Sequence, residues 1–107
     1  MGKLRSKYKV ILLNKALMDI EESFAYLAND NFKVAQEFNI ALFETLKILS
    51  DLPLIGAIYK AEYLPLPELR KMRVKKFEQY WIYYKISGKH IHVARIIHTA
   101  RDVDTLI

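Results

Sequence analysis

Cysteine is absent from this sequence of 107 residues. The chain therefore has no disulfide framework, no thiolate metal site and no cysteine nucleophile, and the cytoplasm is the expected compartment. Long hydrophobic runs are missing as well, since the N-terminal apolar run covers only Val10 to Leu13. Such a run is too short for the core of a signal peptide or for a membrane span, so we expect no membrane partner.

Several catalytic signatures are missing too. The sequence has no glycine-rich phosphate loop, no serine-nucleophile motif and, in its second half, no pair of carboxylates at helical or strand spacing. His92 and His98 would lie about 20 Å apart along an extended strand, too far to share one metal ion. We therefore expect neither a metal nor a cofactor, and most hydrolase and nucleotide-binding functions are excluded.

The composition fits one small globular domain spanning residues 1–107. Hydrophobic residues make up 52% of the chain and aromatic residues 12%, which is enough for a single packed core at this length. The formal net charge of +5 is compatible with an anionic partner, such as nucleic acid or an acidic protein. It is equally compatible with a surface that is charged only for solubility.

The first half of the chain predicts a strand and two helices. Tyr8 to Leu13 is aliphatic and β-branched, which is typical of a short buried strand. From Lys15 to about Asn29, apolar residues recur at helical spacing on one side. A short polar break from Asn29 to Asn31 precedes a second helix from Phe32 to about Leu52, so the two helices should form an antiparallel hairpin.

The second helix has more apolar residues than one stripe needs. Ile40, Phe43 and Ile48 lie partly outside the main stripe. Two interpretations remain open. Either the helix is buried between the sheet and the first helix, or it offers an apolar surface to a partner protein.

The second half predicts three strands after an ordered loop. Pro53 ends the second helix, Gly56 permits a tight turn, and the loop extends to Glu68. Strands joined by two tight turns are then expected over Leu69–Lys76, Tyr80–Ser87 and His90–His98. The fold class is therefore α+β, and the position of the N-terminal strand in the sheet is left open.

The first of these three strands is strongly basic. It places five cations within seven residues, and three aromatic rings follow them: Arg70, Lys71, Arg73, Lys75 and Lys76, then Trp81, Tyr83 and Tyr84. Cations beside rings suit single-stranded nucleic acid, because phosphates pair with guanidinium groups and bases stack on rings. A basic edge strand that prevents aggregation would have the same pattern, so both interpretations remain open.

His98 ends the last predicted strand, and Arg101 and Asp102 follow it closely. The histidine could serve as a general acid or base beside an arginine that stabilises a phosphate. Alternatively, hydrogen bonds hold His98 at the end of the sheet while Arg101 pairs with Asp102. We further expect the basic and aromatic residues of the three strands to converge on one surface.

The order of the elements and several motifs resemble the RelE/ParE toxin superfamily. The resemblance covers Tyr8 to Ile107 and rests on Leu69-Arg70, on Tyr80 to Tyr84 and on Ile91 to Asp102. It implies an N-terminal strand, a helical hairpin and a three-stranded antiparallel meander, with the hairpin packed on one face of the sheet. It also implies a hetero-oligomer with a cognate antitoxin, whose segment wraps the toxin and neutralises it.

Two activities occur in that superfamily. The RelE-like branch cleaves mRNA on the ribosome with basic side chains around the scissile phosphate, whereas the ParE-like branch poisons DNA gyrase and cuts no RNA. Where the RelE-like pattern has an arginine after the tyrosine, this chain has Trp81. A neutral indole cannot offset the charge that builds on a phosphate, so the ParE-like branch is favoured and the protein is not expected to be an enzyme.

The resemblance implies roles for individual residues. The expected gyrase contacts are five basic or histidine side chains over a platform of two rings: Arg70, Arg73, Lys75, His98 and Arg101, with Trp81 and Tyr84 beneath. An acidic, amphipathic antitoxin segment would meet both apolar and basic residues, namely Ile40, Phe43, Lys71 and Arg73.

Two alternatives to gyrase inhibition remain. A RelE-like, ribosome-dependent endoribonuclease would use His98 as acid or base and would hold the phosphate with Arg70 and Arg101. A third interpretation is an inactive toxin-derived module whose only task is to bind its partner.

Overall fold

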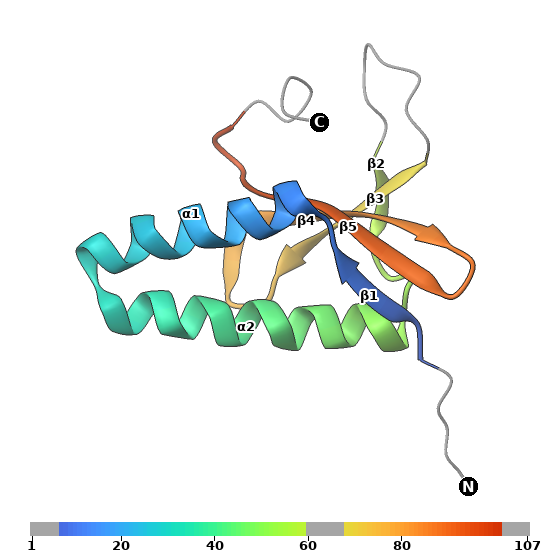
Figure 1. Ribbon diagram of the computed structural model, residues 1–107, viewed down its shortest axis with the longest axis horizontal. Coiled ribbons are helices and arrows are strands. Elements are labelled where there is room, and N and C mark those ends of the chain that lie inside the picture. Colours follow the sequence, from blue (N-terminus) through green and yellow to red (C-terminus); the bar gives the residue numbers. More distant parts are fainter. Residues whose placement is uncertain (1–6, 60–67, 102–107) are drawn as a thin grey trace, which may run out of the picture.

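The computed structural model describes residues 7–59 and 68–101. Within these ranges, two helices pack on one face of a mixed sheet of five strands (Figure 1). The predicted α+β class and the position of the helical hairpin on one face of the sheet are confirmed.

The two helices form an antiparallel hairpin with almost no connecting loop (Figure 1). Helix α1 spans Asn14–Asp30 and α2 spans Phe32–Asp51, so Asn31 alone separates them. The Asn31 side chain accepts a hydrogen bond from the backbone N–H of Val34 at 3.2 Å, and the Asn31 backbone N–H donates to the Leu27 carbonyl at 2.8 Å. One residue therefore ends the first helix and caps the second.

The strands of the sheet lie in the order β1-β5-β4-β3-β2. Their bounds are β1 Lys9–Leu12, β2 Ala57–Tyr59, β3 Leu69–Val74, β4 Phe77–Ser87 and β5 His90–His98. Strands β3, β4 and β5 form the predicted antiparallel meander. Strand β1 joins its far side in parallel with β5, and β2 pairs antiparallel with β3, so the sheet has five strands rather than three.

Strand β2 lies in the segment that was predicted to be a loop. It has only three residues, too few to show an alternating pattern. Its extended form depends on pairing with β3, where Ile58 lies opposite Arg70. Strand β2 pairs with Leu69–Lys71, so this half of the basic strand does not lie at the edge of the sheet, whereas Met72–Val74 has no β2 partner. The interpretation as a protective edge strand is therefore wrong for the first half of β3 and fits only the second half.

Helix α2 supplies the centre of the core. Its main stripe is buried and packs with strand residues such as Ile82 and Ile96; the stripe consists of Ala35, Phe38, Leu42, Leu46 and Leu49. Ile40 and Phe43 are instead 60% and 51% exposed, while Ile48 is partly buried. For the two exposed residues, the interpretation of burial between the sheet and α1 is wrong.

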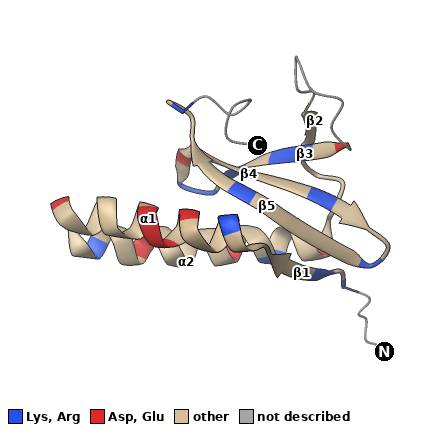
Figure 2. Cartoon of the chain, turned by 45° about the horizontal axis from the view of Figure 1, so that its top comes forward, with Lys and Arg blue, Asp and Glu red and all other residues tan. Residues whose placement is uncertain are grey.

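The sheet divides its side chains between two faces, because neighbouring residues of a strand point to opposite sides. Arg70 and Tyr84 are paired on the face that the helices cover. The other face, called the outer face below, carries Lys9, Lys71, Arg73, Trp81, Tyr83, Lys85, His90, His92 and Ile97. Figure 2 shows basic residues along the strands and acidic residues mainly on the helices.

Candidate functional site

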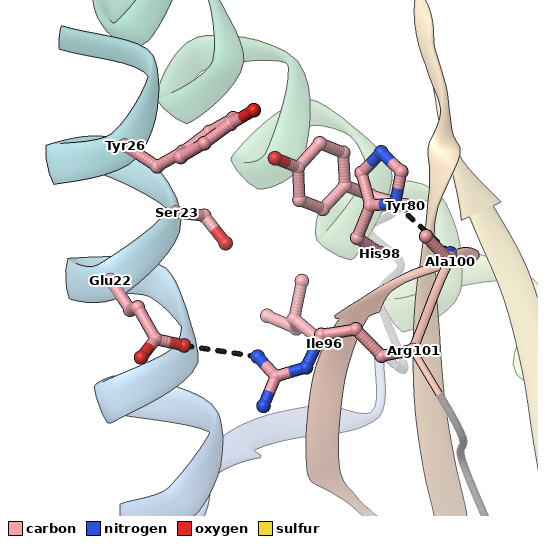
Figure 3. Close-up of a pocket in the computed structure, with 8 residues that line it drawn as sticks. All are labelled: Glu22, Ser23, Tyr26, Tyr80, Ile96, His98, Ala100 and Arg101. Atoms are coloured by element: carbon pink, nitrogen blue, oxygen red, sulfur yellow. Dashed lines mark hydrogen bonds and ion pairs between the residues drawn. The ribbon is translucent and has the colours of Figure 1, made fainter. Parts of the chain in front are cut away.

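A cleft of about 470 Å³ opens between α1 and the end of the sheet where β5 stops (Figure 3). Ser23 and Tyr26 line it from α1, Tyr80 lines it from β4, and His98 and Arg101 line it from the end of β5 and the residues that follow. A partly apolar cleft with a few converging polar groups is the usual form of a binding site. It contains two of the residues for which the sequence predicts a function, His98 and Arg101.

His98 and Tyr80 lie side by side on neighbouring strands. They are paired in the β4–β5 register, and their ring centroids are 5.1 Å apart with nearly perpendicular planes. Nδ1 of His98 accepts a hydrogen bond from the Ala100 backbone N–H at 3.0 Å (Figure 3), so the neutral ring carries its proton on Nε2. The chain after β5 thus holds the imidazole in place, as one of the two interpretations of His98 predicted.

Tyr80 is a neutral phenol at physiological pH. Its side chain is buried, and its ring centroid lies 4.8 Å from that of Phe38. Burial raises the pKa of Tyr80 above its ordinary value, and a hydrogen bond with Ser23 offsets only part of that shift. Tyr80 can therefore donate a hydrogen bond in the cleft, but it does not act there as an anionic base.

Arg101 connects the end of the sheet to α1. Its Nη1 atom lies 3.2 Å from Oε1 of Glu22 (Figure 3). Both side chains are well exposed, so this ion pair stabilises the fold by less than about 1 kcal/mol. Asp102, the predicted partner of Arg101, lies outside the described residues.

Arg70 and Tyr84 hold the turn after α2 and do not reach the cleft. Nη1 of Arg70 donates to the Gly56 carbonyl at 2.8 Å. The Tyr84 hydroxyl donates to the Pro53 carbonyl at 2.8 Å and accepts from the Gly56 N–H at 2.9 Å. A Cβ at position 56 would collide with this hydroxyl and would come within 2.8 Å of the Lys71 carbonyl oxygen, which is why the turn needs glycine.

Arg70 lies far from His98. Arg70 pairs with Tyr84, whereas His98 pairs with Tyr80, so the two residues are four positions apart along β4 and two strands apart across the sheet. At about 3.3 Å per residue and about 4.8 Å per strand, their Cα atoms are roughly 16 Å apart. The structure therefore brings His98 and Arg101 together but leaves Arg70 at a separate place.

Trp81 lies on the outer face in contact with two cations. Nζ of Lys71 is 4.4 Å and Cζ of Arg73 is 4.3 Å from the centroid of its ring. Arg73 also donates to the Glu78 carbonyl at 2.6 Å. Tyr84, the expected second ring of an aromatic platform, is fully buried on the opposite face, so the two rings do not form one platform.

Lys75 lies in the turn between β3 and β4. Its backbone N–H donates to the Thr45 hydroxyl of α2 at 3.0 Å, and its side chain is exposed. The expected gyrase contacts are therefore distributed over the turn after α2, the outer face, the β3–β4 turn and the cleft. The prediction that they converge on one surface is wrong, because strand alternation and register separate them.

The expected antitoxin contacts lie on two surfaces. Ile40 and Phe43 line a shallow apolar groove on α2, together with Asn39, Glu44 and Lys47. Oδ1 of Asn39 is buried and has no hydrogen-bond partner among the described residues. Lys71 and Arg73 lie on the outer face of the sheet instead.

An ion pair between Asp19 and Arg95 was not foreseen. The Asp19 carboxylate accepts two hydrogen bonds at 2.8 Å from the Arg95 guanidinium and one at 2.9 Å from the Ile96 N–H. The hydrogen bond to Asp19 is the largest cause that raises the pKa of Arg95. An arginine within the apolar sequence of β5 is the signal that could have indicated a buried carboxylate partner.

Residues 7–59 and 68–101 offer neither a metal site nor a membrane-spanning helix. No group of three or more histidine, aspartate or glutamate side chains there could hold a metal ion. None of the helices in these ranges has the length and apolar character needed to cross a membrane.

Comparison with known proteins points to one family. Residues 10–103 match the family described as ParE toxin of type II toxin-antitoxin system, parDE. None of the curated proteins matches the sequence. Among solved structures, a chain of the chromosomal ParDE TA system from P. aeruginosa has a TM-score of 0.67 and 18% sequence identity, over 88% of this chain and 98% of that chain. At this identity the likeness to the solved structure concerns the fold alone. The family match covers both helices and the three-stranded meander, and the chain therefore belongs to the ParE toxin family.

Proposed function

We propose that this protein is a cytoplasmic toxin that inhibits DNA gyrase by binding and is neutralised by a cognate antitoxin. The family match over residues 10–103 supports a toxin. The position of Arg70 supports binding rather than RNA cleavage. Its guanidinium is bonded to the turn after α2, and its Cα atom lies roughly 16 Å from that of His98, whereas RelE-like cleavage needs several cations around one phosphate.

The gyrase contacts are assigned to the predicted residues that keep accessible side chains. Arg73, Lys75 and Arg101 are exposed, and His98 is partly exposed at the cleft. Charged groups of this kind contribute to the rate and specificity of association. Arg70 contributes to gyrase binding only indirectly, because its guanidinium positions the turn after α2.

The antitoxin would bind as an amphipathic segment along α2. Ile40 and Phe43 supply exposed apolar area, and such area in a soluble protein usually has a partner. The same groove carries one cation and one anion, so Lys47 suits an acidic residue of that segment and Glu44 suits a basic one. The result is a hetero-oligomer of toxin and antitoxin.

One observation favours a second candidate, the endoribonuclease. The cleft places Tyr80, His98 and Arg101 together, which combines a neutral phenol, an imidazole and a cation. These groups could donate a proton and stabilise a phosphate. The inactive binding module is the third candidate.

A gyrase assay tests the proposal. The purified protein should inhibit DNA supercoiling at micromolar concentration, and the cognate antitoxin should restore it. His98→Ala and Arg101→Ala should each weaken inhibition about tenfold, as expected for the loss of roughly 1.4 kcal/mol of binding. The matched control Lys33→Ala, on α2, should retain full inhibition.

Unaltered supercoiling and DNA cleavage by gyrase at micromolar excess would contradict the proposal. Primer extension on translated message then separates the alternatives, because cut message identifies the endoribonuclease. Induced expression without a growth defect identifies the inactive binding module.

A further inference from the structure

The two layers of the molecule differ in charge. Helices α1 and α2 together carry seven acidic and three basic side chains, whereas the five strands carry six basic and one acidic. The helices cover only one face of the sheet (Figure 2). Of the six strand cations, Arg70 is bonded to the turn after α2 and Arg95 to Asp19. The other four lie on the outer face, which is therefore the part of the described structure that attracts an anionic partner; they are Lys9, Lys71, Arg73 and Lys85.

A diagonal band of basic side chains crosses the outer face. It runs over four strands through Arg73, Lys71, Lys85, His92 and Lys9. From the strand register, the Cα atoms of successive members are about 5 to 8 Å apart and the band is about 25 Å long. Lys9, Arg73 and Lys85 are exposed, and within the described residues no member of the band forms an ion pair with a carboxylate.

Trp81 holds the two cations at one end of this band. Lys71 and Arg73 both lie within 4.4 Å of the centroid of its ring. Cation–π contact fixes the positions of these two side chains. Because both cations lie against the Trp81 ring, a ligand at this place meets their positive charge and not a free ring face. Sites for single-stranded nucleic acid need free rings on which bases stack. Tyr83, the next ring along the outer side of β4, is only 2% exposed, so the outer face lacks a stacking platform there.

An acidic protein fits this surface less well than a phosphate backbone. Tyr83 and Ile97, two large residues beside the band, are each 2% exposed. The partly exposed rings of this face, Tyr59 and Trp81, lie beside cations at 4.3 to 5.6 Å from the ring centroids. Protein interfaces derive most of their affinity from a few buried anchors, often aromatic residues in pockets. The outer face instead offers positive charge beside its accessible rings.

We infer that the outer face binds the phosphate backbone of double-stranded DNA through this band. Phosphates follow one another at about 3.4 Å per strand along the duplex axis, so a 25 Å band spans roughly seven base steps. Contacts to phosphates alone position a protein without reading the base sequence. The inference goes beyond gyrase inhibition and does not depend on it.

Fluorescence anisotropy with a labelled duplex of arbitrary sequence tests the inference. For about four phosphate contacts, the affinity should fall roughly 100-fold when monovalent salt rises from about 50 to 200 mM. Lys85→Glu should weaken DNA binding about tenfold or more. It should also reduce the slope of log affinity against log salt concentration by about the share of one phosphate contact. Lys33→Glu makes the same change of charge at an exposed position of α2 and should leave binding unaltered.

Four results would overturn the inference. The first is no binding at micromolar protein in low salt, and the second is equal loss of affinity in Lys85→Glu and Lys33→Glu. The third is tighter binding of a single strand of the same length, accompanied by quenching of the sole tryptophan, Trp81, because that would indicate base stacking. The fourth is competition by polyglutamate as strong as that by DNA, which would indicate an acidic protein partner. DNA binding is decided by the anisotropy data alone, so a negative gyrase assay does not affect it.

Discussion

The hydroxyl of Tyr84 links β4 to the turn that ends α2. It donates to Pro53 and accepts from Gly56 at the same time, and Arg70 adds a third bond to this turn. Burial raises the pKa of Tyr84, so the hydroxyl keeps its proton under ordinary conditions. Its contribution is therefore to stability.

Tyr84→Phe should lower the free energy of unfolding by about 1 to 3 kcal/mol, because both backbone groups of the turn lose their partner inside the protein. Urea denaturation followed by Trp81 fluorescence measures the change. The matched control is Tyr26→Phe, whose side chain is 74% exposed, and it should alter stability by no more than about 0.5 kcal/mol. Equal effects of the two substitutions would contradict this role of Tyr84.

The ion pair of Asp19 and Arg95 predicts a larger effect. Their side chains are 7% and 12% exposed, so Asp19→Ala removes a carboxylate from a buried arginine and from the Ile96 N–H. Loss of one partner of a buried pair costs about 3 to 5 kcal/mol. Glu22→Ala, which removes the exposed partner of Arg101, should cost less than about 1 kcal/mol. Thermal unfolding should rank the two variants in this order, and the reverse order would refute the assignment.

Several residue roles could not be predicted because they depend on which segments meet in space. Arg70 was expected to contact the target, but the turn at Gly56 folds back against β3 and binds its guanidinium. Arg95 required an acidic partner, yet nothing in the sequence selects Asp19 among twelve acidic residues. By contrast, the pairing of β4 with β5, which brings Tyr80 to His98, follows from strands joined by a short turn.

At the scale of single elements, α2 has two sides that differ in burial. One side fills the core, and the groove around Ile40 and Phe43 remains exposed. The double variant Ile40→Ser and Phe43→Ser should therefore keep the stability of the isolated protein within about 1 kcal/mol.

Antitoxin binding by this double variant should be at least about tenfold weaker, since buried apolar anchors dominate such interfaces. Isothermal titration with the cognate antitoxin measures the change. Leu17→Ser with Met18→Ser replaces a comparable pair of exposed apolar residues on α1 and should bind normally. Unchanged affinity of the α2 variant would remove this groove from the interface.

Periodicity was sufficient for the long elements. Both helices and the three strands of the meander have enough residues to show a repeat, and their bounds are close to the predicted ones. The exception is the turn between β3 and β4, which falls at Lys75 and Lys76 because β4 begins at Phe77 and not at Tyr80. Strand β2 has three residues and no repeat. The place of β1 beside β5 depends on a contact between Lys9 and His90, which no local pattern contains.

At the scale of the whole molecule, helices and sheet form an acidic and a basic layer. The net charge of +5 does not indicate this separation, because a net charge says nothing about where the individual charges lie. The helices therefore present mainly negative charge to their surroundings, and the outer face of the sheet presents positive charge.

The pairing of β1 with β5 has a consequence for synthesis. The first strand finds its sheet neighbour only when the last strand has been made, because Lys9 pairs with His90. Nascent chains stalled after Ser87, with a linker long enough to clear the exit tunnel, should be digested rapidly by protease. Chains stalled after the complete sequence with the same linker should resist, and equal resistance would show that the sheet forms without β5. The order of folding thus differs from the order of translation: β1 is made first, but it is among the last strands to join the sheet.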